Sequence, residues 1–326
     1  MQEIRQSKLF IAIQVIILCI IMDCGNPSVK KYQFLVSPKG LVPAFWLSVK
    51  AGADSAGQEL GVDIIWNGPV NETDIAVQIS ILENYINKRV DAIVLAGCDT
   101  KALVPVVEKA RDANIPVVTI DSDIDSDIPA SYIGTDNILG ARMGAETLVK
   151  LIGGKGKVAC IPNVPGAATH ILREEGFRQG IKEYPKVKLV AVQYCQSDVA
   201  LAMSITENIL TAHPDLAGIF AGSGLAAIGC AQALVAREVK GKVKLVSFDS
   251  GPNELQALKS GVVQALVAQD PFKMGYLGVK TAFDVLKKKK VEKRIDTGVA
   301  IVTLDNMDDP SIQKILFPQG KRDNVE

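Results

Sequence analysis

The sequence has no excess of charge of either sign, because 36 Lys and Arg residues balance 36 Asp and Glu residues in a chain of 326. Such a balance gives no electrostatic attraction to nucleic acid or to an anionic surface, so we expect no nucleic acid partner. Aromatic residues are scarce, at 5% of the chain, while Ala, Val, Ile and Gly are frequent. This composition fits an α/β fold better than a β-sandwich, and the length is typical of two domains.

Motifs for catalysis, metal binding and nucleotide binding are absent from the sequence. No cysteines form a C-x-x-C pair, and we expect four of the six to be small core residues: Cys98, Cys160, Cys195 and Cys230. The two histidines, His170 and His213, lack the context of a serine or cysteine nucleophile. The G-x-S-x-G motif and the glycine-rich dinucleotide and phosphate loops are missing. The acidic run Asp121, Asp123 and Asp125 lacks the calcium-loop pattern. We therefore expect no enzyme activity, no cofactor and no metal.

One pattern occurs twice, in residues 91–123 and again in residues 216–251. Each copy reads as an apolar strand, a turn of small residues, an amphipathic helix and a second apolar strand that ends in Asp-Ser. This alternation indicates parallel βαβ units buried on both faces. We predict an α/β fold of two similar, doubly wound parallel-sheet lobes. Ligands bind such sheets at the carboxyl ends of the strands, where Asp121 and Asp249 stand.

The N-terminus has the layout of an export signal. Arg5 and Lys8 precede an apolar stretch over residues 9–22. That stretch is shorter than the about 20 residues of a transmembrane helix but fits the apolar region of a signal peptide. Residues 1–24 are therefore predicted to direct export.

Cys24 follows the apolar stretch and resembles the lipid-attachment cysteine of bacterial lipoproteins. The turn-rich residues 25–31 would then be a tether. Asp23 stands where those signals usually have a small residue, so an uncleaved anchor or ordinary signal-peptidase cleavage stays an alternative.

Two aromatic residues mark the first lobe as a candidate for sugar binding. Phe45 and Trp46 open a predicted helix over residues 44–60. Adjacent helical positions cannot both face the core, so at least one ring is expected to face the crevice, where it suits the C–H face of a sugar. The alternative is one ring in the core and one in a contact between lobes. We interpret Asp121 as an acceptor for ligand hydroxyls.

The second lobe offers a cation and a turn of small residues. Arg173 lies on a predicted helix near a strand end, where its fork could reach two ligand oxygens. A surface ion pair with Glu174 or Glu175 is the alternative. Ser223, between two glycines, lies at a strand end where backbone groups can approach a ligand, although a tight turn would explain it equally.

Several stretches together resemble periplasmic sugar-binding proteins of the ribose-binding type, the solute receptors of ABC importers. They are PAFWLSVKAGA, NIPVVTIDSD, TDNILGARMG, LREEGF, LTAHPDLAGIFA, VSFDS and VAQDPFKMG. The match covers essentially everything after residue 31. It implies three crossings between lobes, near Thr135, Gln269 and Asp296, with Gln269 as a hinge-side ligand contact. The implied lobes are discontinuous: residues 32–135 plus 270–296, and residues 136–269 plus 297–326.

The resemblance also implies roles for five residues already selected. Phe45 and Trp46 would form an aromatic sandwich on the sugar ring. Asp121 and Asp249 would accept hydrogen bonds from hydroxyls, and Arg173 would be a bidentate donor.

Departures from the ribose pattern argue against ribose itself as the ligand. Ser122, Ser223 and Ser197 stand where ribose receptors have an Arg, an Asn and an aromatic ring. Lys39, with the acidic run after residue 120, is similar to receptors for the furanone autoinducer-2, and we include Lys39 among the ligand-binding residues. Those receptors do not share Arg173.

We therefore expect a monomeric, exported solute receptor of the periplasm or cell envelope, with a lipid anchor at Cys24 as one alternative. It would deliver a small sugar or polyol to an ABC permease of the inner membrane. A sensory subunit that presents a sugar or autoinducer-2 type ligand to a membrane protein is the alternative. The effector-binding core of a LacI-type repressor is less suitable, because an apolar segment replaces the basic helix-turn-helix.

Overall fold

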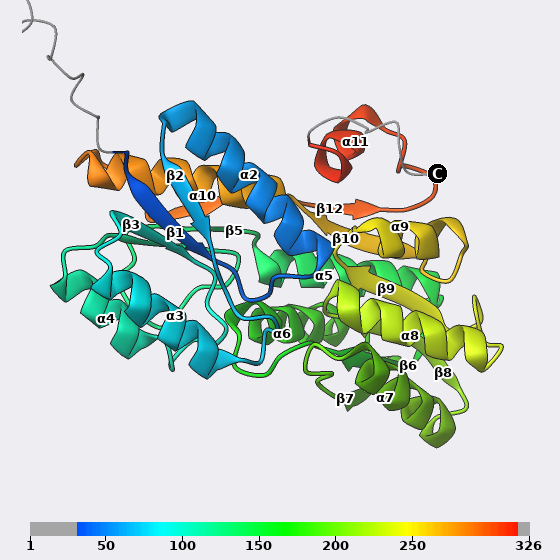
Figure 1. Cartoon of the computed structure of the whole chain (residues 1–326). Coiled ribbons are helices and arrows are strands. Elements are labelled where there is room, and N and C mark those ends of the chain that lie inside the picture. Colours follow the sequence, from blue (N-terminus) through cyan, green and yellow to red (C-terminus); the bar gives the residue numbers. More distant parts are fainter. Residues whose placement is uncertain (1–30, 319–326) are drawn as a thin grey trace, which may run out of the picture. The chain divides into compact units, whose positions relative to one another are not determined.

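The computed structural model describes residues 31–318 and contains two six-stranded sheets (Figure 1). We call each sheet with its helices the N-lobe and the C-lobe. The N-lobe sheet has the order β11-β5-β4-β3-β1-β2. Its strands are β1 (Gln33–Ser37), β2 (Asp63–Trp66), β3 (Ala92–Leu95), β4 (Val117–Ile120), β5 (Tyr132–Gly134) and β11 (Arg294–Asp296). Its helices are α2 (Ala44–Leu60), α3 (Ile75–Asn87), α4 (Val104–Asp112) and α10 (Pro271–Leu286).

The C-lobe sheet has the order β12-β10-β9-β8-β6-β7. Its strands are β6 (Gly156–Ile161), β7 (Val187–Val192), β8 (Leu216–Ala221), β9 (Lys244–Phe248), β10 (Ala265–Gln269) and β12 (Val299–Val302). Its helices are α5 (Asn137–Leu151), α6 (Ala168–Lys182), α7 (Val199–Ala212), α8 (Gly224–Ala236), α9 (Pro252–Lys259) and α11 (Pro310–Leu316).

The topology confirms the predicted fold class of two doubly wound lobes. Every strand pairing in the N-lobe is parallel. In the C-lobe, the pairing of β10 with β12 is antiparallel and the others are parallel. The chain passes between the sheets after β5, after β10 and after β11. Three connections of this kind allow two lobes to move as rigid bodies about a hinge.

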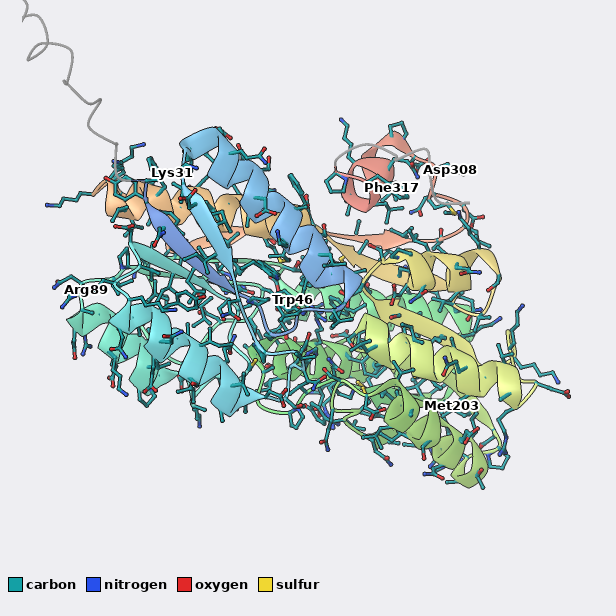
Figure 2. The ribbon with its side chains drawn as sticks, viewed as in Figure 1. Lys31, Trp46, Arg89, Met203, Asp308 and Phe317 are labelled. Carbon is teal, nitrogen blue, oxygen red and sulfur yellow. The ribbon has the colours of Figure 1, made fainter. Side chains whose placement is uncertain are left out.

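The α2 helix shows how local sequence sets the bounds of an element. Pro43 precedes it, and Gly61 ends it in the left-handed conformation at φ 67°, donating its amide to the Gly57 carbonyl. Proline suits a helix start and glycine suits a left-handed end, so the predicted bounds of this helix are confirmed. Its first turn projects toward the carboxyl ends of the N-lobe strands, and Figure 2 marks Trp46 there.

The α10 helix follows a C-lobe strand but packs on the N-lobe, against α2. The two helices approach so closely that a Cβ at Gly52 would lie 2.0 Å from the Phe272 carbonyl oxygen. Gly275 makes the reciprocal approach to the Val49 carbonyl. Only glycine permits this separation, and the contact ties α10 to the N-lobe.

Each face of the C-lobe sheet has its own apolar core. One core gathers residues of α7, α8 and α9, and the other gathers residues of α5 and α6. In the second core, Phe177 stacks on Phe220 with ring centroids 4.6 Å apart, and Phe220 meets Phe248 edge-on. The four cysteines expected in the core are buried and free, which confirms that prediction.

Across the described residues 31–318, no helix combines the length and hydrophobicity needed to cross a membrane.

Candidate functional site

The candidate site lies where strands of both lobes end. Residues that follow the carboxyl ends of these strands are Lys39 after β1, Glu72 after β2, Asp121 after β4, Asn163 after β6, Ser197 after β7, Ser223 after β8 and Asp249 after β9. Gln269 is the last residue of β10. Because parallel strands end at one edge of each sheet, these side chains can converge on one cleft.

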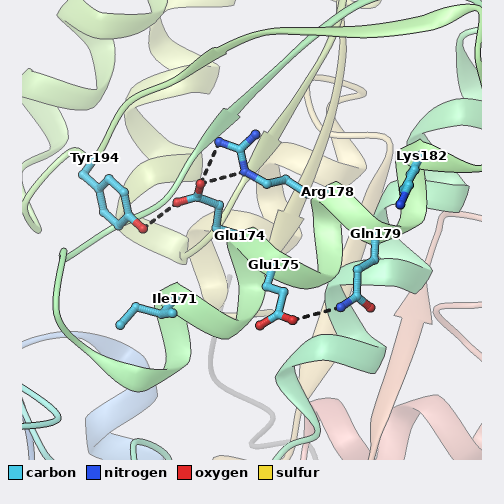
Figure 3. A pocket seen from close by; sticks show the side chains of 7 residues that line it. All are labelled: Ile171, Glu174, Glu175, Arg178, Gln179, Lys182 and Tyr194. Atoms are coloured by element: carbon cyan, nitrogen blue, oxygen red, sulfur yellow. Dashed lines mark hydrogen bonds and ion pairs between the residues drawn. The ribbon is translucent and has the colours of Figure 1, made fainter.

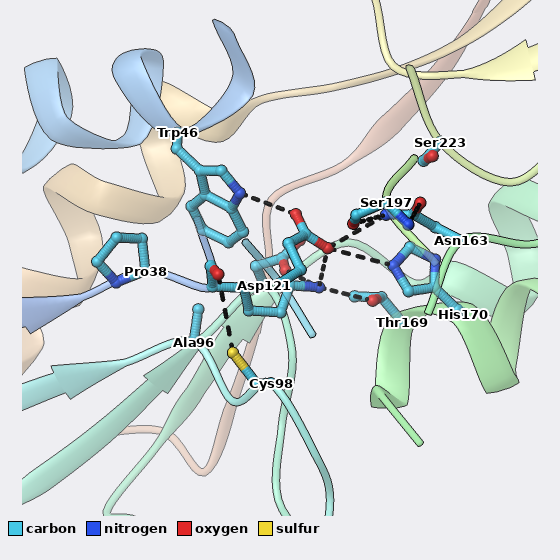
Figure 4. A network of polar contacts seen from close by, with 12 residues as sticks. Pro38, Trp46, Ala96, Cys98, Asp121, Asn163, Thr169, His170, Ser197 and Ser223 are labelled. Carbon is cyan, nitrogen blue, oxygen red and sulfur yellow. Dashed lines mark hydrogen bonds and ion pairs between the residues drawn. The ribbon is translucent and has the colours of Figure 1, made fainter. Parts of the chain in front are cut away.

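Side chains of the two lobes meet directly at these strand ends, and we call this region between the lobes the cleft (Figure 4). Lys39 Nζ donates a hydrogen bond to Thr169 Oγ1 at 3.0 Å. Glu72 Oε2 accepts from Asn163 Nδ2 at 3.3 Å, and His170 Nε2 lies 3.7 Å from the same oxygen. Lys39 and Glu72 belong to the N-lobe and their three partners to the C-lobe. The two lobes therefore share one polar network in this conformation.

Lys39 and Asp121 form a buried ion pair at the N-lobe wall of the cleft. Lys39 Nζ lies 3.0 Å from Asp121 Oδ2, and both side chains are 3% exposed. The ammonium also lies 5.7 Å from the centroid of the Trp46 ring. Trp46, which is 1% exposed, donates from Nε1 to Glu72 Oε1 at 2.9 Å. Phe45 is partly exposed and meets Trp46 edge-on. Two of the predicted residues, Lys39 and Asp121, are therefore adjacent, and Trp46 lies beside them.

Arg173 is buried in the C-lobe and makes no surface ion pair, so that alternative is wrong. Its Nε donates to Asn137 Oδ1 and its Nη1 to the Gly222 carbonyl, each at 2.8 Å. The guanidinium carbon lies 3.9 Å from the centroid of the Phe248 ring. Helix α6 supplies the arginine and helix α5 the asparagine, so packing between these helices fixes the guanidinium at the strand ends.

Asp249 and Gln269 form the hinge-side part of the site. Asp249 Oδ2 accepts from the Gly224 amide at 2.9 Å, and Asp249 Oδ1 accepts from Gln269 Nε2 at 2.7 Å. The amide oxygen of Gln269 is buried without a protein partner. The predicted acceptor and the predicted hinge contact are thus in direct contact with each other.

Asp121 and Asp249 share an uncommon backbone conformation. Their φ angles are 55° and 73°, in the left-handed region that non-glycine residues seldom adopt. Such strain costs about 1–2 kcal/mol per residue and clusters at functional sites. The two positions are equivalent in the repeated pattern, which supports a matched role in the two lobes.

Two serines have local structural roles. Ser223 is the N-cap of α8, and its Oγ accepts from the Ala226 amide at 3.2 Å. Ser197 accepts from Asn163 Nδ2 at 2.9 Å and orients that amide toward Glu72. Helix capping explains Ser223 without a ligand, and ligand contact by it remains a prediction.

Burial and charge set the protonation of the cleft. Burial works against the charged form of Lys39, but the carboxylates of Asp121 and Glu72 outweigh it and raise the Lys39 pKa. Although burial disfavours its charged form, Glu72 has a pKa lowered to about 2, chiefly by the Lys39 charge. Burial lowers the pKa of His170 to about 3. At neutral pH the network therefore contains a charged Lys39, an ionised Glu72 and a neutral imidazole.

Comparison with known proteins agrees with this geometry. The periplasmic binding protein domain matches residues 34–290. The D-ribose/D-allose-binding protein of Pseudomonas aeruginosa is 33% identical over 286 residues, which cover 84% of this chain and 89% of that protein. This chain belongs to the ribose-type family of periplasmic binding proteins.

Other relatives extend the similarity within this family. The ribose import binding protein of Bacillus subtilis is 30% identical over 282 residues, which cover 86% of this chain and 90% of that protein. A carbohydrate transporter solute binding protein of Agrobacterium radiobacter, solved in complex with D-arabinose, aligns with a TM-score of 0.86 at 38% identity. The alignment covers 89% of this chain and all of the other. These matches confirm the resemblance, and the proteins matched are binding proteins rather than enzymes. The family implies an exported, periplasmic protein.

The network contains residues that the sequence did not single out. Glu72, Asn163, Thr169 and His170 were not selected, although all four are buried at the cleft. Two of them could have been found by the rule that selected Asp121, because Glu72 and Asn163 also follow strands. His170 precedes Arg173 by one helical turn and so shares its face of α6.

A surface hollow of about 440 Å³ lies on the other face of α6 (Figure 3). It is lined by Ile171, Glu174, Glu175, Arg178, Gln179, Lys182 and Tyr194. Glu174 pairs with Arg178 and with the Tyr194 hydroxyl, and Glu175 accepts from Gln179. The carboxylates of the hollow are thus already paired, and it includes none of the cleft residues.

The polar network of the cleft includes neither a metal site nor the predicted lipid-attachment residue. In the described part of the chain, no group of three His, Cys, Asp or Glu side chains is placed to hold a metal ion. Cys24, the predicted lipid-attachment residue, lies outside the described residues 31–318.

Glu254 gives the site a group that titrates near neutral pH. This buried residue of α9 has its pKa raised from 4.5 to about 7 by burial, with a further contribution from the Asp249 charge. The folded state therefore keeps a proton that the unfolded state loses above pH 4.5. The stabilisation this provides is complete below that pH and is lost as pH rises through about 7. We expect the free energy of unfolding of the wild type, relative to Glu254→Gln, to fall by about 3 kcal/mol between pH 4.5 and pH 8.

Urea unfolding of both proteins at a series of pH values measures this difference. Parallel pH profiles for the wild type and Glu254→Gln would show that Glu254 does not hold its proton in the folded protein.

Proposed function

We propose that this protein is the solute receptor of an ABC importer and binds a small sugar or polyol in the cleft between its lobes. The observation that carries the proposal is the direct meeting of N-lobe and C-lobe polar side chains, as between Lys39 and Thr169. A ligand with several hydroxyls can pair with groups of both walls. The relatives support this class of ligand, since they are named for D-ribose and D-allose, and one was solved with D-arabinose.

The mechanism follows from the three connections between the sheets. Closure about them brings the C-lobe residues Thr169 and Asn163 to Lys39 and Glu72 of the N-lobe. A ligand that contacts both walls interacts more strongly with the closed form than with the open form, and this difference shifts the population toward closure. A permease can then distinguish the loaded receptor by its closed conformation.

Asp249 and Asp121 are proposed as the acceptors for ligand hydroxyls, Arg173 as a bidentate donor, and Gln269 as a contact at the hinge. The side-chain oxygen of Gln269 is buried without a hydrogen-bond partner, which supports its role as a ligand contact. Trp46 and Phe45 are proposed to cover the apolar face of the sugar. Export through residues 1–24, with lipid attachment at Cys24, completes the proposal.

A thermal-shift screen tests the function. The panel contains D-ribose, D-allose, D-arabinose, other pentoses and hexoses, polyols and autoinducer-2. Because a ligand that binds only the native state raises the melting temperature, at least one sugar or polyol should give a saturable increase. The absence of any increase across the panel would contradict the proposal.

Asp249→Ala tests the placement of the site with the best ligand of the screen. Loss of a charged acceptor should weaken binding about 10- to 100-fold, or ~1–3 kcal/mol, in isothermal titration calorimetry. Asp215→Ala is the matched control, because Asp215 is an exposed residue paired with Lys157 on the C-lobe surface. Equal affinities for the two variants would place the ligand elsewhere.

A further inference from the structure

His170 is a buried histidine whose hydrogen-bonding capacity is unused by the protein. It lies in the first turn of α6 and is 2% exposed. Neither Nδ1 nor Nε2 has a hydrogen-bond partner. Figure 4 shows the His170 ring at the C-lobe wall of the network, and its Nε2 lies 3.7 Å from Glu72 Oε2. A buried polar group without a partner costs free energy, so such a group calls for an explanation.

Charge pairing with Glu72 does not explain His170. The distance of 3.7 Å from Nε2 to Glu72 Oε2 is longer than a hydrogen bond. Burial, together with the positive charges of Lys39 and Arg173, lowers the pKa of His170 to about 3 despite the nearby Glu72. The imidazole is therefore neutral, and a neutral imidazole always offers one N–H donor and one acceptor nitrogen.

Groups with unused hydrogen-bonding capacity also occur elsewhere in the cleft. Asp121 Oδ2 has Lys39 as an ion-pair partner but accepts no hydrogen bond, and the Gln269 amide oxygen accepts none. These atoms come from the N-lobe wall and from the hinge, while His170 belongs to the C-lobe wall. A single ligand with hydroxyls on several sides could satisfy all three.

We propose that His170 contacts the ligand and determines specificity, exchanging a hydrogen bond with one hydroxyl of an uncharged sugar beside Glu72. This inference rests on the proposed function and names a ligand contact within the same cleft. The charges around the imidazole support an uncharged ligand, because the two cations, Lys39 and Arg173, are equalled in number by the carboxylates of Asp121 and Glu72. A hydroxyl can give its proton to the imidazole nitrogen or accept the ring N–H, so either tautomer serves.

The test compares His170→Leu with His170→Gln in the full chain. The probe is whichever of D-ribose, D-allose or D-arabinose binds the wild type most tightly, together with its monodeoxy analogues. Leucine removes both hydrogen-bonding groups, so we expect affinity for the probe to fall at least tenfold. Glutamine keeps a donor and an acceptor and should bind within a few-fold of the wild type. One monodeoxy analogue should bind the wild type more weakly than the parent sugar does. The same analogue and the parent sugar should bind His170→Leu with equal affinity.

Stability of the ligand-free protein separates this role from a structural one. If His170 serves only a ligand, its replacement by leucine should leave the melting temperature of the ligand-free protein unchanged or raised. His213→Leu, which alters the other histidine at the end of α7, is the control and should change neither affinity nor specificity.

The possible failures are distinguishable. Probe affinity and analogue discrimination unchanged in His170→Leu would overturn the role of His170 and leave the proposed function standing. A wild type that binds no sugar of the panel would overturn both.

Discussion

Replacement of Arg173 by alanine is expected to weaken sugar binding at least about 100-fold, or about 3 kcal/mol. The side chain is 3% exposed, and its bonds to Asn137 and to the Gly222 carbonyl use two of the five guanidinium N–H donors. The ligand is proposed to take others. Alanine removes those donors from the ligand, and it also leaves the two protein acceptors unpaired in a buried site, which lowers the stability of the folded protein.

Arg178→Ala provides a matched control for this prediction. Arg178 lies on the same helix but is half exposed and pairs with Glu174 at the surface, so its loss should leave affinity unchanged. Arg173→Lys keeps the charge without the planar fork and should also lose most of the affinity. Calorimetry with the sugar found in the screen measures the affinity of the three variants, Arg173→Ala, Arg173→Lys and Arg178→Ala. Circular dichroism shows whether each variant is folded. Wild-type affinity in a folded Arg173→Ala protein would exclude Arg173 from the site.

Lys39→Met is expected to lower the free energy of unfolding by about 3–5 kcal/mol. The ammonium lies 3.0 Å from Asp121 Oδ2 and 4.0 Å from Glu72 Oε2, and all three groups are largely buried. Methionine fills similar space but leaves two carboxylates in the cleft without their cation. An unpaired buried charge is far more costly than the loss of an exposed ion pair.

Urea unfolding measures this loss against two comparisons. Lys50→Met removes a half-exposed lysine that pairs with Asp54 on α2, and it should cost less than about 1 kcal/mol. The double variant Lys39→Met with Asp121→Asn should lose less than the sum of its single variants, by about 1–3 kcal/mol, because it removes both charges of one pair. Equal stability of the Lys39 and Lys50 variants would show that the buried pair does not stabilise the fold.

Much of the fold could be predicted because it depends on local patterns. Short apolar runs between amphipathic stretches indicated parallel strands and helices, and Pro43 and Gly61 marked the bounds of α2. The strand-end positions of Asp121 and Asp249 followed from the same pattern, since a parallel sheet places ligands at its carboxyl edge. The buried cysteines could be assigned to the core for lack of any close pair.

The partners of the candidate residues could not be predicted in this way. Lys39 was selected only through a family resemblance, and nothing in its own segment indicates Thr169, 130 positions away. Glu72 and Asn163 are 91 positions apart and carry no periodic signal. His170 was set aside for lack of a nucleophile, because an unpaired imidazole is recognised only once its surroundings are known.

By itself, the sequence determined most of the order of strands and helices, the two-lobe architecture and the strand-end carboxylates, because these depend on residues close together in the chain. It did not predict the short strand β11 or the helix α11. Only the tertiary structure decided which of those side chains meet, which are buried and which lack a partner. These properties arise where the ends of two sheets face each other, and such contacts join positions that have no regular spacing along the chain.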